Sequence, residues 1–301
     1  HADLRGANLA GANLEGASFA GANLSDAVFT RANLTDAVLT GSTLTGANLA
    51  EANMHNAKVD GGVNLENANF TRSNLSGVVF AGANLGEAMM LETVAAEADF
   101  GGVTATRLVL HNVKMPGVSF RGAHIEQAVF IDSDLAGVDF TGAKVPGTCM
   151  VQVRADGAKF DDADCNNLRV VYESSMNGAS FKNTQLDTAN FRDTPMRGAN
   201  MSGANAPKSD LSGCDLEDAD LTGLVANDAL LVRTNLKRAN LTGANLMQAI
   251  LQKSTIEEAD FSKANLFRAD FAKIKGNAGT KFDGANMKFI RFVDRGDHGQ
   301  R

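Results

Sequence analysis

The sequence lacks several features that a globular protein of this length normally has. Its 301 residues include no tryptophan, one tyrosine, four prolines and three cysteines, and aromatic residues make up only 6%. No run of about 18 apolar residues occurs, so we expect no insertion into a membrane. Three cysteines without a CxxC pair form neither a disulfide framework nor a metal site, which favours a reducing compartment.

Catalytic motifs are missing as well. The chain has no G-x-S-x-G elbow, Walker loop, HExxH helix or dinucleotide-binding fingerprint. Each of these motifs places a nucleophile, a phosphate cradle or metal ligands at fixed spacing. We therefore expect no catalytic residues, no cofactor and no metal, and we predict that the protein is not an enzyme.

A five-residue period dominates what is present. A large apolar residue, called the centre below, recurs at every fifth position: Leu4, Leu9, Leu14, Phe19, Leu24, Phe29 and Leu34. Two residues before each centre stands a small residue, which is alanine in eleven of the twelve repeats centred on Leu4 to Val59. An α-helix cannot keep this stripe on one side, whereas a short strand points both positions the same way. The remaining two residues then turn a corner.

A longer period groups the repeats into coils. Phenylalanine centres recur at intervals of 20 at Phe80, Phe100, Phe120, Phe140 and Phe160. Stacked aromatic rings at one interior corner of a four-repeat coil would produce this interval. The sequence therefore predicts an all-β fold, a right-handed four-sided parallel β-helix with about 20 residues per coil and roughly 14 coils.

The repeat continues along the whole chain with three interruptions. Its register shifts by one residue near 60–63, 166–174 and 272–280, and none of these stretches has the composition of a linker. We therefore predict a single domain over residues 1–301. The first residues, His1 to Leu4, lack an initiator methionine and already lie within a repeat. We expect the chain to be a fragment of a longer protein.

The pattern Ala-(Asp/Asn)-Leu-x-x, repeated over residues 2–292, resembles the pentapeptide-repeat family. The resemblance implies the β-helix described above. Within that family, the chain is similar in particular to the repeat tails of accessory proteins associated with type VI secretion. Other members include DNA-mimicking topoisomerase inhibitors and secreted effectors, so the fold alone does not decide the function. The chain departs from the family pattern where a larger residue occupies the small position, which predicts a wider interior. These residues are Thr93, Val103, Leu108, Val113, Val118, Val138 and Val153.

One face of the predicted coils carries apolar residues at outward positions. These positions flank the centres Met90, Leu110, Phe130, Met150 and Val170. A bounded apolar patch with polar edges marks an interaction surface. A bulged coil that turns these side chains inward is the alternative. The candidate partner-binding residues are Met89, Leu91, Val109, His111, Val129, Ile131, Val151 and Val171.

Charge is unevenly distributed along the chain. Residues 1–230 contain 15 basic and 28 acidic side chains, whereas residues 231–301 contain 13 basic and 7 acidic ones. Arg233, Lys253 and Lys273 fall at the same predicted corner of three successive coils. Stacked like charges are unfavourable unless a counter-charge covers them, so this ladder is a candidate contact for an anion or an acidic partner. Splayed, solvated side chains are the alternative.

Two functions are compatible with these features. The first is a non-enzymatic rigid scaffold, a protein–protein interaction module of a larger bacterial protein, with secretion as a narrower assignment. It would present the apolar face to a protein partner or to a second copy. The alternative is a DNA-mimicking inhibitor of a type II topoisomerase (gyrase), which needs a continuous acidic surface that the basic last 71 residues interrupt.

The same features give expectations about location and nucleic acids. We expect a cytoplasmic protein, with secretion as an effector or accessory protein as the alternative. Direct binding of nucleic acid is not expected, because the basic residues are few and are not interleaved with aromatic ones.

Overall fold

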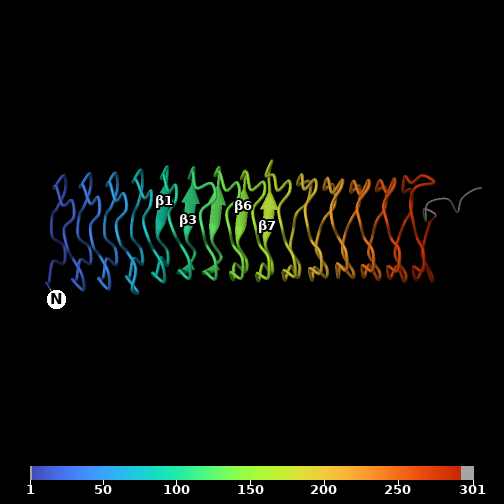
Figure 1. Ribbon diagram of the computed structural model, residues 1–301, viewed down its shortest axis with the longest axis horizontal. Coiled ribbons are helices and arrows are strands. Elements are labelled where there is room, and N and C mark those ends of the chain that lie inside the picture. Colours follow the sequence, from blue (N-terminus) through green and yellow to red (C-terminus); the bar gives the residue numbers. More distant parts are fainter. Residues whose placement is uncertain (1, 293–301) are drawn as a thin grey trace, which may run out of the picture. The chain divides into compact units, whose positions relative to one another are not determined.

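The computed structural model describes residues 2–292 and comprises two compact units, His1–Lys159 and Phe160–Arg301 (Figure 1). Each unit is an all-β parallel solenoid, and the described residues contain no helix. The single domain over residues 1–301 remains a prediction. Residue 1 and residues 293–301 of that predicted domain lie outside the described residues.

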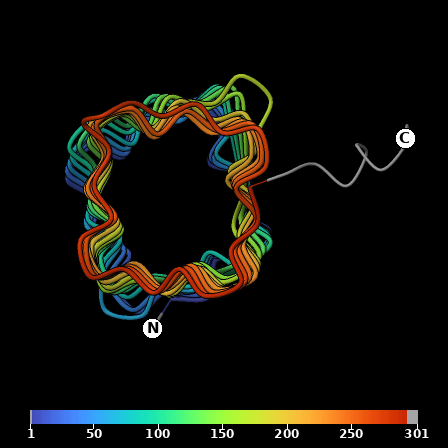
Figure 2. The same cartoon turned by 90° about the vertical axis from the view of Figure 1, so that its right-hand side faces the viewer.

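Parallel bridges connect successive coils within each unit. Most bridges join residues 20 positions apart, as between Asp3 and Asn23. Figure 2 shows that the coils of each unit lie over one another, so residues 20 apart form columns. One extra residue is accommodated where the spacing rises to 21, as at the bridges Thr43↔Asn64, Asp164↔Gln185 and Asp260↔Lys281.

A tight turn follows most centres. The backbone N–H of Ala7 donates to the carbonyl of Leu4 (N···O 3.0 Å), and Gly6 between them has φ 63°. A bond across four residues with positive φ at the third is the pattern of a type II turn. Non-glycine residues adopt the same conformation at equivalent positions, such as Asp26 with φ 58°.

Asparagine and aspartate before the centre stabilise this turn and the stacking of coils. The N–H of Ser25 donates to Oδ1 of Asn23 (3.1 Å), which fixes the backbone across the centre between them. The side-chain amide of Asn84 donates to Oδ1 of Asn64 one coil earlier (3.0 Å). These two bonds give a physical reason for the Asp/Asn position of the repeat.

Seven repeats contain an extended strand of three residues around the centre. Four of the enlarged small positions, Thr93, Leu108, Val113 and Val153, lie two residues after β1, β2, β3 and β6, and all four are buried. The strands are β1 (Met89–Leu91), β2 (Thr104–Thr106), β3 (Val109–His111), β4 (His124–Glu126), β5 (Val129–Ile131) and β6 (Cys149–Val151) in the first unit, and β7 (Arg169–Val171) in the second.

The centres and the small residues form the core of each unit. In the first unit, ring centroids lie 4.7, 4.8 and 5.0 Å apart along the stacked column Phe80, Phe100, Phe120 and Phe140. Phe160 belongs to the second unit, where its ring stacks on Phe181 at 4.8 Å. Since all these rings are fully buried, the aromatic column is a continuous part of each core.

Serine and threonine at the small position keep their hydroxyl groups bonded to backbone carbonyls. Ser73 Oγ donates to the carbonyl of Phe70 (2.7 Å), and Thr184 Oγ1 donates to that of Phe160 (2.6 Å). Thr148 differs, because its Oγ1 is buried and has no hydrogen-bond partner among residues 2–292. A buried hydroxyl without a partner costs about 1–3 kcal/mol.

Replacing Thr148 with valine should therefore stabilise the fold. Valine keeps the shape of threonine and removes the unpaired hydroxyl, so we expect the free energy of unfolding to rise by about 1 kcal/mol. The matched variant Thr184→Val removes a bonded hydroxyl at an equally buried small position and should lower it by a similar amount. Urea denaturation measures both; changes of the same sign would contradict the assignment.

Replacing Phe120 with alanine should destabilise the first unit strongly. The ring is fully buried between the rings of Phe100 and Phe140, so its removal leaves a cavity that neighbouring coils cannot fill. We expect a loss of about 3–5 kcal/mol in the free energy of unfolding. Phe19→Ala, at a half-buried centre of the first coil, should cost less. A loss below about 1 kcal/mol for Phe120→Ala would place this ring outside the core.

Candidate interaction surface

Four parallel strands of the first unit bring the predicted apolar residues together. β1 pairs with β3, β3 with β5, and β5 with β6, each in register over three residues (Figure 1). This register places one outward residue directly above another in every coil. We call these outward residues the apolar face. Its first column contains Met89, Val109, Val129 and Cys149, and its second column contains Leu91, His111, Ile131 and Val151.

The side chains of the apolar face point outward. Each strand has a fully buried central residue, such as Leu110 or Phe130, between two half-buried or exposed neighbours. Met89 is 41% exposed, and Ile131 is half-buried. These flanking residues therefore do not turn inward as a bulged coil would require.

Val171 is the one predicted contact residue outside the first unit. It lies at the end of β7 in the second unit, where it is half-buried and precedes the exposed Tyr172. Seven of the eight predicted residues lie in one face of the first unit, and Val171 belongs to the second unit.

Polar residues border the apolar face. Asn69 bridges Met89 from the coil before β1, so the first column ends on an amide. Beside the second column, Arg72 bonds both carboxylate oxygens of Glu92 (2.9 and 3.1 Å), and this hydrogen bonding lowers the pKa of Glu92. His111 Nε2 lies 3.3 Å from Oδ2 of Asp132 on the same edge. The face is a limited apolar area with a polar rim, as interaction surfaces are.

The predicted basic ladder lies at one corner of the second unit. Arg233, Lys253 and Lys273 are all exposed and have φ values of 60°, 61° and 58°. The backbone N–H of Arg233 donates to the carbonyl of Gln252 (2.9 Å), and that of Lys253 donates to the carbonyl of Ala272 (3.0 Å). These bonds stack the three corners on successive coils, as the 20-residue spacing predicts.

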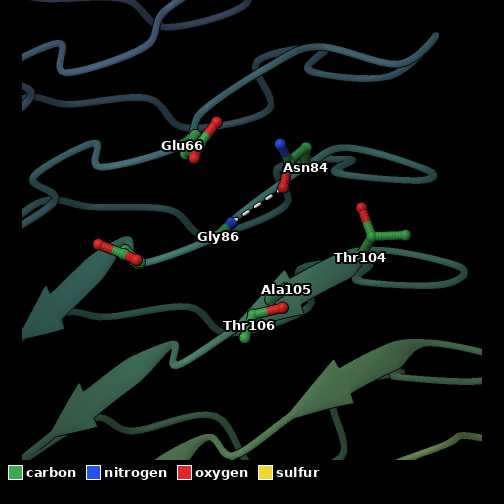
Figure 3. A pocket seen from close by; sticks show the side chains of 7 residues that line it. Glu66, Asn84, Gly86, Thr104, Ala105 and Thr106 are labelled. Atoms are coloured by element: carbon green, nitrogen blue, oxygen red, sulfur yellow. Dashed lines mark hydrogen bonds between the residues drawn. The ribbon is translucent and has the colours of Figure 1, made fainter.

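A hollow on the first unit is not among the features predicted from the sequence (Figure 3). It has a volume of about 420 Å³ and forms where Gly86 lacks the side chain that Glu66 and Thr106 carry at the same place in adjacent coils. The small centre Ala105 deepens it, so Gly86 and Ala105 were the signal in the sequence. No group of three or more His, Cys, Asp or Glu side chains suited to a metal occurs in the described chain, this hollow included.

The repeat pattern matches the family described as pentapeptide repeats, in eight copies. The matches cover more than half of the chain, at residues 1–36, 27–62, 61–90, 117–152, 188–223, 214–253 and 229–266. The chain belongs to the pentapeptide-repeat family. Fold and sequence pattern therefore agree on a β-solenoid built from tandem five-residue units.

Solved structures of pentapeptide-repeat proteins resemble this chain. HetL from the cyanobacterium Nostoc sp. strain PCC 7120, a protein involved in heterocyst differentiation regulation, is 23% identical, with 76% of this chain and 90% of HetL covered and a TM-score of 0.40. QnrB1, a plasmid-mediated fluoroquinolone resistance protein, is 17% identical over 60% of this chain and 92% of its own, with a TM-score of 0.41. No curated protein matches the sequence.

A third pentapeptide-repeat structure, from the thylakoid lumen of Arabidopsis thaliana, is 29% identical over 29% of this chain and 66% of its own, with a TM-score of 0.25. Within the described part of this chain, nothing helical has the length and hydrophobicity needed to cross a bilayer.

The three cysteines of this pentapeptide-repeat protein differ in accessibility. Cys149 is half-buried at the end of the first apolar column, whereas Cys165 and Cys214 are buried. Burial raises the pKa of the Cys165 thiol far above its ordinary value and raises that of Cys214 to about 12. Both buried thiols are therefore protonated and shielded, and thiol reagents act on thiolates.

Thiol labelling should separate these sites. In the native protein we expect a maleimide to modify Cys149 only, and in denaturant to modify all three cysteines. Intact-mass spectrometry counts the added groups, and Cys149→Ser is the control that should remove native labelling. Rapid native labelling of Cys165 or Cys214 would contradict the inward position of those residues.

Proposed function

We propose that this protein is a non-enzymatic rigid scaffold that binds a protein partner through its apolar face. The observation that carries the proposal is the stack of four paired strands whose outward residues are apolar, while the coil before them carries Asn69. Covering apolar surface contributes about 25 cal/mol per Å². A partner with a complementary apolar strip, either another protein domain or a second copy, would gain this energy.

The finer architecture supports a role as scaffold. A coil of 20 residues with a bend every five residues makes four sides, and we infer a right-handed four-sided β-helix of roughly 14 coils over the chain. Backbone bonds tie the coils densely together: Leu4 N–H donates to the Asn23 carbonyl (2.8 Å), and Asn23 N–H donates to the Ala2 carbonyl (3.0 Å). Such a framework holds a surface in place without ordering costs on binding.

The narrower assignment concerns the cellular setting. We infer a cytoplasmic module of a larger bacterial protein, with export as a secretion-associated effector or accessory protein as the alternative. Three free cysteines, two of them buried, support a reducing compartment. The association with secretion rests on the likeness of the repeat pattern to type VI accessory tails.

Changing Ile131 to aspartate tests the apolar face. The carboxylate would stand in the middle of the contact and would lose its water on binding, which is costly without a partner charge. We expect binding to fall at least tenfold while the melting temperature stays within a few degrees, because Ile131 points outward. A crosslinker attached at Cys149 reports the contact in the full-length protein, since Cys149 pairs with Val129 in the same face.

The matched control is Val28→Asp. Val28 is an outward residue of the Met89 column, three coils before Met89, and is flanked by Asn8 and Asn48 rather than by apolar residues. It should change neither binding nor stability. Unfolding of the Ile131→Asp protein would place this side chain inside the core, and equal crosslinking in both variants would refute the role of the apolar face.

The gyrase-inhibitor alternative draws support from the excess of acidic residues before position 231. Many of these carboxylates are already paired, however, as Glu51 is with Arg31 (2.8 Å) and Glu217 with Arg197 and Arg238 (both 2.6 Å). A carboxylate that shares its charge with an arginine is a poor substitute for a phosphate.

We therefore expect no inhibition of DNA supercoiling by gyrase at low micromolar protein. The assay follows conversion of relaxed to supercoiled plasmid on agarose gels. Clear inhibition at that concentration would make the DNA mimic the better assignment.

A further inference from the structure

One corner of the second unit carries charges that are separated by sign. The corner column, as we call it, contains Glu173, Asp193, Gly213, Arg233 and Lys253, with φ values of 55°, 58°, 72°, 60° and 61°. Backbone bonds stack its members from Asp193 onward: the N–H of Asp193 donates to the Ser212 carbonyl (2.8 Å), and that of Gly213 to the Val232 carbonyl (2.8 Å). Two acidic residues, a glycine and two basic residues therefore follow one another on successive coils, and Lys273 follows Lys253 at the same corner.

Some stacked corner residues elsewhere in the chain neutralise one another's charges. In the first unit, Arg31 bonds both oxygens of Glu51 on the next coil (2.8 and 3.3 Å). In the second unit, Arg238 bonds both oxygens of Asp218 (2.7 and 2.8 Å). Opposite signs alternate at these corners, so each charge meets its counter-charge one coil away.

The corner column lacks this neutralisation. Among residues 2–292, neither Glu173, Arg233 nor Lys253 takes part in an ion pair. Asp193 has one at 3.8 Å to Arg192, and that arginine also lies 3.4 Å from Asp210. Like charges on adjacent coils repel one another, so the column is unfavourable until counter-charges from another molecule cover it.

The order of the charges identifies a fitting partner. Rotation by a half-turn about an axis through Gly213 exchanges the acidic and basic ends of the column, so the column is complementary to itself in an antiparallel arrangement. A second copy has the same coil spacing, 4.8 Å between the rings of Phe160 and Phe181, and every pair therefore stays in register. Gly213 has no side chain, which allows close approach at the axis.

We propose that the corner column is the interface of an antiparallel dimer of this chain. Arg233 pairs with the partner's Asp193, and Lys253 pairs with the partner's Glu173, which gives four ion pairs across a two-fold axis at Gly213. Such an interface is isologous, because the same surface is used on both copies. The corner column belongs to the second unit, whereas the apolar face belongs to the first.

A hollow lies at the acidic end of the column. It has a volume of about 300 Å³, and its lining includes Tyr172, the carboxylates Glu173 and Asp193, and the arginines Arg169 and Arg192. Tyr172 is 75% exposed and belongs to the stretch with the extra residue, which projects from its coils in yellow-green in Figure 2. The partner's Lys253 would lie at the edge of this hollow beside Glu173, with its stem against the tyrosine ring.

Charge-swapped variants test the dimer. The double variant Arg233→Glu with Lys253→Glu makes the column wholly acidic, and Glu173→Lys with Asp193→Lys makes it wholly basic. We expect the wild-type protein to sediment as a dimer at low ionic strength and to dissociate in about 0.5 M salt, where screening is strong. Each double variant alone should be monomeric, and an equimolar mixture should form a one-to-one heterodimer.

The double variant Lys208→Glu with Lys263→Glu is the control for backbone strain and net charge. These lysines are exposed at other corners of the same unit with φ 56° and 60°, so this variant changes the charge equally in the same backbone conformation. It should dimerise like the wild type. Ile131→Asp should also dimerise, because it alters only the apolar face, and circular dichroism checks that each variant is folded.

Three outcomes would overturn the proposal. If the wild-type protein is monomeric at low ionic strength, it has no such interface. A different molecule that carries both positive and negative groups would then have to cover the column. Dimers in either double variant alone would place the contact elsewhere. A mixture of the two double variants that stays monomeric would show that the charges of the corner column do not meet.

Discussion

The parallel hydrogen bonding between coils is the constraint on which the rest of this structure depends. Each coil donates and accepts at the same backbone positions as the next one, so residues 20 apart are held in columns inside and outside the core. Each outward side chain is therefore presented together with the side chains stacked on it from the neighbouring coils. The character of a surface is set by what the sequence repeats at intervals of 20, and stability becomes nearly a sum over neighbouring coils.

Inside each unit, this constraint turns individual residues into continuous columns. The stacked rings from Phe80 to Phe140 exist because every coil places its centre over the one before. The same arrangement explains how hydroxyl groups are tolerated at small positions, where a turn carbonyl lies within reach, as for Ser73. Thr148 shows the limit, since its hydroxyl is buried at the same kind of position without a partner.

Outside the core, columns amplify small biases in composition. Where apolar residues recur at outward positions, they join into a face across β1, β3, β5 and β6. Where the sign of the charge alternates from coil to coil, arginine and carboxylate side chains pair and neutralise each other, as Arg31 and Glu51 do. Where the signs are separated, as from Glu173 to Lys253, the charge remains available to another molecule. One framework can thus carry surfaces of different character.

The sequence by itself determined the repeat, the positions that face the core and the membership of each column, because a strict five-residue period admits one assignment of inward and outward residues. It therefore predicted the phenylalanine stack and the outward direction of Met89 and Ile131. Only the tertiary structure decided which charges pair, that Gly86 and Ala105 open a hollow, and that the compact units divide between Lys159 and Phe160. Periodicity fixes where each Cα lies in a column, but pairing and hollows depend on side-chain rotamers and on neighbouring side chains, which the period does not specify.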